Sequence, residues 1–123
     1  MDGSDAFAVR PPSIGYTGDG TGVIGKLPAR PGAGRLDWEV WSDRVAYGVG
    51  TVWLDDCTPD CAQGGFHAYS GRVLADRVVD GHFTRMTILI EYGTHYVTDI
   101  RVLRRAGPRS YQWAILSQVG FPP

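Results

Sequence analysis

The sequence contains no hydrophobic run that is long enough to cross a membrane as a helix. Its apolar residues occur in short stretches between glycines, prolines and charged residues, whereas a membrane-spanning helix needs roughly 18 or more apolar residues in succession. An excess of charge of one sign is also missing, because the formal net charge is −1 at pH 7. We therefore expect neither an integral membrane protein nor a protein that binds nucleic acid.

The amino terminus lacks the apolar stretch of a secretory signal peptide. Residues 1–12 are mostly small or polar and end in a Pro-Pro pair, a composition that predicts a flexible N-terminal arm. Residues 13–123 predict a single β domain and have the usual length of one domain. We expect that a signal peptide has been removed ahead of the arm.

The sequence also lacks helical periodicity. No segment places its apolar residues at the spacing of about 3.6 residues that an amphipathic helix shows. Instead, 17 glycines and 8 prolines separate short segments in which apolar and polar residues alternate, as in half-buried strands. The strands that this pattern predicts are 13–16, 23–27, 36–41, 44–54, 66–79, 83–92, 95–103 and 110–119.

These segments predict an all-β fold, a single-domain antiparallel β-sandwich or small barrel of about eight short strands. From Phe66 onward, consecutive hairpin signals such as Asp80-Gly81 favour a meander. In the segment 44–54, Ala46, Gly48 and Gly50 share one face. Small residues on one face allow another backbone or an aromatic ring to approach the strand closely.

The only two cysteines lie close together in DDCTPDCAQGG, residues 55–65. Pro59 favours a tight turn between Cys57 and Cys61, and such a turn brings two Cα atoms within the distance that a disulfide requires. A short disulfide is the interpretation that we favour. It predicts an oxidising compartment and therefore an exported protein.

Two alternatives remain open for the cysteine pair. A structural zinc site needs a second pair of ligands, and although His67 is near the loop, His82 and His95 are isolated in the sequence. Unpaired cysteines are usually small core residues, whereas these two flank a polar loop. A redox CxxC motif does not fit, because three residues separate the cysteines and no helix follows. We expect no bound metal and no cofactor.

Three segments carry a family resemblance: PPSIGYTGDGTG, AYGVGTVWLDDCTPDCAQGGFHAY and FTRMTILIEYG. They resemble a functionally uncharacterised family of small secreted actinobacterial proteins, in which a glycine-spaced strand runs into a D/N-C-x-P-x-C-A-x-G loop and then into an aromatic-rich strand. The resemblance covers Pro11 to Tyr92, and the cysteine loop is its most specific part. The segment LPARPGAGRLDWEVW is longer than the family pattern. The resemblance implies export and a disulfide, and it supplies no catalytic residues.

Motifs that would indicate catalysis have simpler explanations. The segment 20–25, GTGVIG, has the spacing of a dinucleotide-binding loop, but Pro28 prevents the helix that this motif requires. Ser70 lacks the strand–helix elbow of a hydrolase nucleophile. A hydrolytic carboxylate pair would have to come from four acids whose spacing does not favour it: Asp55, Asp56, Asp60 and Asp99. We therefore predict no catalytic residue, and the sequence favours a protein that is not an enzyme.

Four arginines cluster around one predicted turn: Arg101, Arg104, Arg105 and Arg109. Such a cluster is a candidate site for a phosphate or an acidic polymer. More often it is a solvated strand end that protects an edge from aggregation. Because acids elsewhere offset the charge, we favour the solvated strand end.

Aromatic side chains are the strongest candidates for binding. On the predicted strands, we assign a candidate binding role to Trp41, Trp53 and Tyr47. The alternation in 36–41 places Trp41 on the same face as Asp37 and Glu39, so we expect its ring to be exposed. Exposed rings on a secreted β protein stack against sugars or contact protein partners.

Together these features predict an exported, non-catalytic binding module, secreted or in the cell envelope, with an extracellular or cell-envelope ligand whose identity the sequence does not give. A carbohydrate-binding domain that uses exposed aromatics is one alternative. A small secreted hydrolase is another, and it predicts a cleft in which His67 or His82 meets carboxylates.

Overall fold

The structure is a computed structural model that describes residues 7–27, 30 and 32–120. In this part of the chain there is no α-helix, and thus none long and apolar enough to cross a membrane. The strands are β1 (Ser13–Gly15), β2 (Gly22–Gly25), β3 (Leu36–Trp41), β4 (Ala46–Asp55), β5 (Phe66–Val79), β6 (His82–Tyr92), β7 (His95–Gly107) and β8 (Ser110–Val119). The all-β prediction is confirmed.

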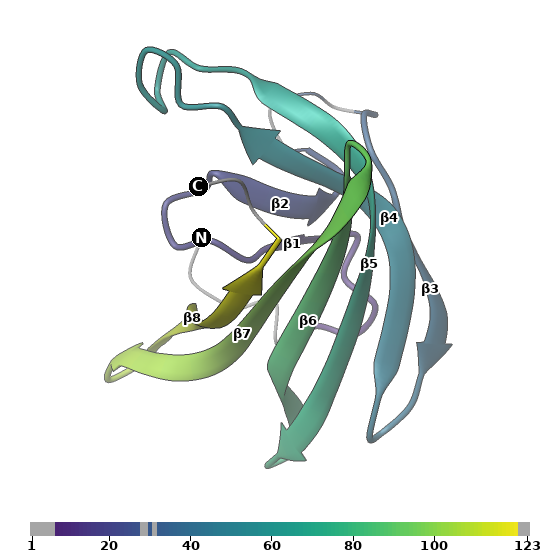
Figure 1. The fold of residues 1–123 in the computed structure, drawn as a ribbon. Helices are drawn as coiled ribbons and strands as arrows, with labels where there is room; N and C mark the ends of the chain where they lie inside the picture. Colours follow the sequence, from purple (N-terminus) through teal and green to yellow (C-terminus); the bar gives the residue numbers. More distant parts are fainter. Residues whose placement is uncertain (1–6, 28–29, 31, 121–123) are drawn as a thin grey trace.

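The strands form one antiparallel sheet in the order β1-β2-β4-β5-β6-β7-β8, with β3 as an additional partner of β4. β2 and β3 both pair with β4, but with different parts of it. β2 pairs with residues 52–54 of β4, and β3 pairs with residues 46–50. β5 to β8 are the predicted meander. Figure 1 shows that the sheet curls into a half-barrel, so the barrel alternative is nearer to the fold than two stacked sheets.

Glycines in β4 allow β3 to lie close to it. A Cβ atom on Gly50 would stand 2.4 Å from the carbonyl oxygen of Arg35, and a Cβ atom on Gly48 would stand 3.1 Å from the ring of Trp38. The first of these distances is shorter than a side chain tolerates against backbone. The expectation that the small face of this strand admits another backbone and an aromatic ring is therefore confirmed.

The inner face of the half-barrel holds the main hydrophobic core. Along β6, Met86, Ile88 and Ile90 are buried, and the residues between them are partly exposed. This alternation is what a strand with one buried face requires. The largest buried cluster contains Ile14, Tyr16, Ile24, Val52, Val73, Met86, Ile88, Ile90, Val97 and Trp113. Its members come from strands at both ends of the sheet order, so the core fixes the curl as well as the pairing.

A β-bulge in β3 changes the position of Trp41. The register of β3 against β4 shifts between Trp38 and Val40, and an extra residue reverses the alternation beyond it. The Trp41 ring consequently packs edge-to-face on Trp38 and on Phe83, at centroid distances of 4.9 and 5.5 Å. Val40, 46% exposed, takes the outward position. The prediction that Trp41 points away from Trp38 into solvent is wrong.

The predicted arm is described only from residue 7 onward, and its first six residues lie outside the described part of the chain. The ring of Phe7 contacts those of His82 and Tyr111, at centroid distances of 4.5 and 5.3 Å. The carbonyl of Pro11 accepts a hydrogen bond of 2.9 Å from the Trp38 indole. The described end of the arm thus lies against β3, β6 and β8.

Candidate functional site

A pocket of about 680 Å³ opens beside the disulfide loop. Its wall combines the β1–β2 turn, the end of β4, the start of β5, the end of β6, and residues of β7 and β8. This volume lies within the range of roughly 300–1,000 Å³ that is typical of small-molecule sites. The curled sheet therefore brings residues of five strands and one turn together around a space of ligand size.

The inner wall of the pocket contains a buried ion pair on β7. Arg101 donates hydrogen bonds from Nε and Nη2 to the two carboxylate oxygens of Asp99, at 2.8 and 3.0 Å. Gln118 of β8 donates a further hydrogen bond of 3.0 Å to Asp99 Oδ2. Asp99 is 1% exposed and Arg101 6%. Buried charges persist in a fold only when they are paired and hydrogen-bonded in this way.

This pair corrects the prediction for Arg101. The sequence placed Arg101 in a solvated arginine cluster, whereas the structure buries it on the inner face of β7. Arg104, Arg105 and Arg109 are exposed. The cluster is divided because alternation along β7 turns Arg101 to the same face as Val97, and because the last residues of the strand extend beyond the core.

Tyr16, which follows β1, adds an unpartnered hydroxyl to the same wall. The residue is 1% exposed, and its hydroxyl oxygen has no hydrogen-bond partner in the described structure. The guanidinium of Arg101 lies over the ring, 5.4 Å from its centroid. Burial, with a smaller contribution from the Asp99 carboxylate, raises the pKa of the Tyr16 hydroxyl well above its ordinary value. The hydroxyl therefore stays protonated and can both donate and accept a hydrogen bond.

Two tyrosine rings form another part of the wall. Tyr69 of β5 and Tyr92 of β6 stack with their centroids 5.0 Å apart and their planes 25° apart. Both side chains are half-buried. Partial burial, and then the neighbouring Tyr92, raise the pKa of Tyr69. The pair gives the pocket a flat apolar surface with polar edges.

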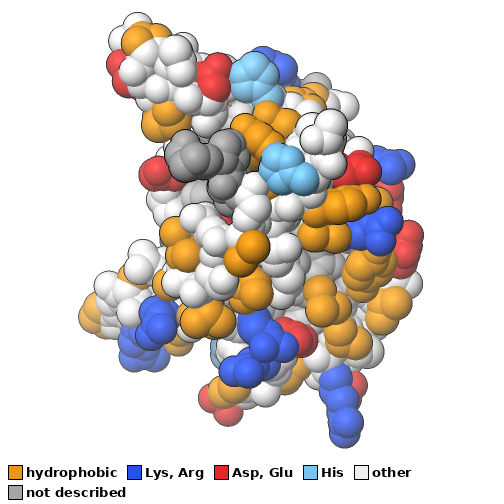
Figure 2. Space-filling view, in the orientation of Figure 1, with side chains coloured by type: hydrophobic (Ala, Val, Ile, Leu, Met, Phe, Trp, Pro, Cys, Tyr) orange, Lys and Arg blue, Asp and Glu red, His pale blue; other side chains and the backbone are white. Residues whose placement is uncertain are grey.

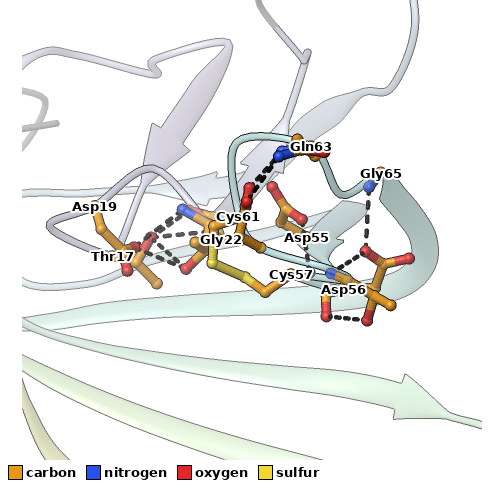
Figure 3. Close-up of a disulfide and its surroundings, with 12 residues drawn as sticks. Thr17, Asp19, Gly22, Asp55, Asp56, Cys57, Cys61, Gln63 and Gly65 are labelled. Carbon is orange, nitrogen blue, oxygen red and sulfur yellow. Dashed lines mark hydrogen bonds between the residues drawn. A yellow bond between two sulfur atoms is a disulfide. The ribbon is translucent and has the colours of Figure 1, made fainter.

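Asp56 and His67 meet at the rim of the pocket. His67 Nε2 lies 3.0 Å from Asp56 Oδ2, and Asp56 Oδ1 accepts backbone hydrogen bonds from Thr58 and Gly65 (Figure 3). The hydrogen bond from His67, followed by the two backbone amides, lowers the pKa of Asp56. In the described part of the chain, no serine, threonine or cysteine is hydrogen-bonded to His67, so the pair has no attached nucleophile.

Two further carboxylates of the pocket wall hold local turns. Asp19 Oδ1 accepts hydrogen bonds from the amide and the hydroxyl of Thr21, at 3.1 and 2.7 Å, and these bonds lower the pKa of Asp19. Asp55 Oδ1 accepts a hydrogen bond of 2.8 Å from the amide of Cys57. Short acids that cap their own turns in this way are common in loops, and they fix the shape of the rim.

Cys57 and Cys61 form the predicted disulfide (Figure 3). The loop that it closes contains a cis peptide bond between Thr58 and Pro59. Because both sulfur atoms are in the disulfide, neither is available as a thiolate ligand for zinc. Among the described residues, no group of three or more histidine, cysteine or acidic side chains is arranged to hold a metal ion.

The three aromatic residues predicted to bind a ligand, Trp41, Trp53 and Tyr47, lie outside this pocket. Trp53 is 7% exposed, and its indole donates a hydrogen bond of 3.0 Å to the carbonyl of Gly25. Tyr47 is half-buried on β4, and Trp41 packs on Phe83. Of the four acids considered as a carboxylate pair, the structure brings Asp55, Asp56 and Asp99 to the pocket, while Asp60 is not part of its wall.

Sequence reasoning missed the ion pair, Tyr16 and the stacked tyrosines. One signal for the ion pair was available: Asp99 and Arg101 occupy alternate positions in register with Val97. Charged residues on the apolar face of a strand indicate a buried pair. No comparable signal marks Tyr16, because its neighbours in the wall come from distant parts of the chain.

The arrangement is suited to holding a small polar molecule: a buried polar group at the inner wall, flat rings at one side and acids at the rim.

The chain matches no family model, no curated protein and no solved structure.

Proposed function

We propose that this protein is an exported, non-catalytic binding module that holds a small polar ligand in the pocket of the half-barrel. The observation that carries the proposal is the unpartnered Tyr16 hydroxyl beside the buried Asp99–Arg101 pair. A buried polar atom without a partner costs about 1–3 kcal/mol. A ligand that supplies the partner recovers this free energy, which gives the pocket a specific point of attachment.

Export is the second part of the proposal. The Cys57–Cys61 disulfide indicates an oxidising environment outside the cytoplasm. The resemblance of the cysteine loop to small secreted actinobacterial proteins supports secretion or a place in the cell envelope. Fractionation of the source cells tests this part: we expect the protein in the medium or the envelope fraction, and recovery from the cytoplasm alone would contradict it.

A thermal-shift screen tests the binding function. Small polar metabolites and soluble fragments of cell-envelope polymers are added one by one, and a true ligand raises the melting temperature because it binds only the folded state. Gly18→Trp is the blocking variant, since Gly18 lines the pocket and a Cβ there meets no atom within 4 Å. The control variant is Val79→Trp, which adds the same indole far from the pocket, at a residue that is 52% exposed.

We expect the stabilising compounds to act on the wild type and on Val79→Trp, and to lose their effect on Gly18→Trp. If no compound stabilises the wild type, or if Gly18→Trp responds equally, the pocket is not a binding site and the proposal fails.

A carbohydrate ligand is a second candidate, favoured by the stacked rings of Tyr69 and Tyr92 in the pocket wall. Sugars present apolar faces that stack on aromatic rings, and their hydroxyls bind the polar edges of a site. Tyr92→Ala should then abolish retention on a polysaccharide column that retains the wild type. Unchanged retention would exclude this pair as the sugar platform.

A further inference from the structure

The wall of the pocket is strongly acidic in a molecule that is nearly neutral. Four carboxylates line it, those of Asp19, Asp55, Asp56 and Asp99, against the single guanidinium of Arg101. The whole chain contains 12 Lys and Arg residues and 13 Asp and Glu residues. In Figure 2, several Lys and Arg side chains gather at the bottom of the view, away from the disulfide loop at the top.

The charge of the wall is not balanced by its own cations. The guanidinium of Arg101 is neutralised by Asp99. The Asp56 carboxylate already forms hydrogen bonds with His67 and two backbone amides. Asp19 and Asp55 accept their hydrogen bonds through Oδ1. Their Oδ2 atoms lie outside these bonds. A cleft lined by one sign of charge focuses the electrostatic potential and concentrates ions of the opposite sign.

Two observations other than charge also describe a ligand site here. The Tyr16 hydroxyl is unpartnered although the residue is 1% exposed, so the pocket wall contains a polar atom that can accept a hydrogen bond from an N–H or O–H donor. The rings of Tyr69 and Tyr92 also line the pocket, and aromatic rings attract organic cations through their faces.

We propose that the pocket selects a small organic cation, with its ammonium group near Asp19 and Asp55 and its carbon skeleton against Tyr69 and Tyr92. This inference rests on the proposed binding function and names the chemical class of the ligand. Carboxylates and aromatic rings together distinguish such a cation from a neutral molecule of the same shape, because only the cation gains from both.

Calorimetric titration of the wild-type protein with matched pairs of compounds tests the proposal. Choline is compared with dimethylbutanol, its neutral carbon isostere, putrescine with butanediol, and glucosamine with glucose. We expect at least one cation to bind about tenfold more tightly than its neutral partner. Its affinity should also fall as salt is added, since exposed charges are screened.

Variants locate the binding site. Asp19→Asn and Asp55→Asn keep an oxygen that accepts the turn hydrogen bonds but remove the charge, and each should weaken the cation severalfold without affecting a neutral compound. Tyr16→Phe removes only the unpartnered oxygen. It should weaken the same cation while leaving the melting temperature of the free protein unchanged or higher, which a purely structural role would not produce. Gly18→Trp should abolish binding.

The outcomes separate this inference from the proposed function. Equal affinity for a cation and its isostere, or an unchanged affinity in both Asp→Asn variants, overturns cation selectivity. If all three cations fail to bind but a neutral or anionic compound from the thermal-shift screen binds and is blocked by Gly18→Trp, the inference is wrong and the binding function stands. If no compound of either set binds, both are wrong.

Discussion

Single residues decide the character of the pocket, and Asp99 and Arg101 are the clearest example. Their charges are buried on the inner face of β7 and compensate each other through two hydrogen bonds. A pair of this kind contributes little net stability, because desolvation offsets the attraction between the charges. Removing one partner is different, since the remaining charge is left buried and unpaired.

We therefore predict that Arg101→Met lowers the free energy of unfolding by about 3–5 kcal/mol, whereas the double variant Asp99→Leu/Arg101→Met recovers most of this loss. Urea unfolding of the two variants and the wild type measures the difference. The double variant should nevertheless lose ligand binding, because it removes the polar inner wall. A double variant as unstable as the single one would show that packing, not the unpaired charge, accounts for the loss.

Trp41 illustrates how the position of one residue depends on a neighbour. It is half-buried against Trp38 and Phe83, beside the small cluster of Ala46 and Ala75. We predict that Trp41→Ala lowers the free energy of unfolding by about 2 kcal/mol, less than the roughly 3–5 kcal/mol of a fully buried tryptophan.

The matched control for Trp41 is Val40→Ala in the same strand. Val40 is 46% exposed, and its truncation should change stability by no more than about half a kcal/mol. Thermal or chemical unfolding of both variants checks the pair. If Trp41→Ala leaves the stability unchanged, Trp41 does not contribute to packing and is again a candidate for an exposed binding residue.

At the level of strands, cross-strand pairs connect β5 to β6. Asp76 and Arg85 lie opposite each other in this ladder, and Arg85 Nε donates a hydrogen bond of 2.8 Å to Asp76 Oδ1. The hydrogen bond from Arg85, and then its charge, lower the pKa of Asp76. The folded-state pKa is thus below the unfolded value of about 3.9. The pair consequently stabilises the fold above this unfolded value, and the contribution is lost as the pH falls through the folded pKa.

The lowered pKa of Asp76 determines how the stability of the fold changes with pH. We predict that Asp76→Asn destabilises the protein at neutral pH and much less in acid, so that stability falls less steeply below about pH 4 than in the wild type. Arg85→Gln should flatten the same part of the curve. Urea midpoints measured across the acid range test this, and a wild-type slope in both variants would mean that the pair is not linked to stability.

The disulfide contributes to the stability of the whole molecule, because it covalently constrains the loop beside the pocket. Cys57 and Cys61 are four positions apart, and a loop this short gives about 2 kcal/mol by chain entropy. We predict that the oxidised protein is lighter than the reduced protein by the pair of hydrogen atoms lost on oxidation. Cys57→Ser/Cys61→Ser should reduce the free energy of unfolding by about 2 kcal/mol.

Intact mass and thiol alkylation before and after reduction measure the first effect, and urea unfolding measures the second. Full alkylation of both cysteines in fresh protein without a reductant would contradict the disulfide. A double serine variant with wild-type stability would show that the loop is held by its side-chain hydrogen bonds, such as those of Asp55 and Asp56.

The strands, the meander and the disulfide could be predicted from the sequence alone, because each depends on local information. Alternation of apolar and polar residues is a property of consecutive positions, so 36–41, 66–79 and 110–119 match β3, β5 and β8. The loop between the cysteines is likewise a matter of a few residues. Where the local pattern was interrupted by a bulge, after Trp38, the predicted exposure of Trp41 was wrong.

The half-barrel and its pocket could not be predicted in this way, because they depend on contacts between distant parts of the chain. Tyr16, Tyr69 and Asp99 are far apart in the chain and meet because the sheet curls. Close contacts between neighbouring strands, such as Gly50 of β4 against the backbone of Arg35, likewise join positions that are apart in the sequence. Periodicity shows that a residue faces inward, but it does not show which other inward residue lies opposite. That depends on the order and bending of the strands, which are set by packing over the whole sheet.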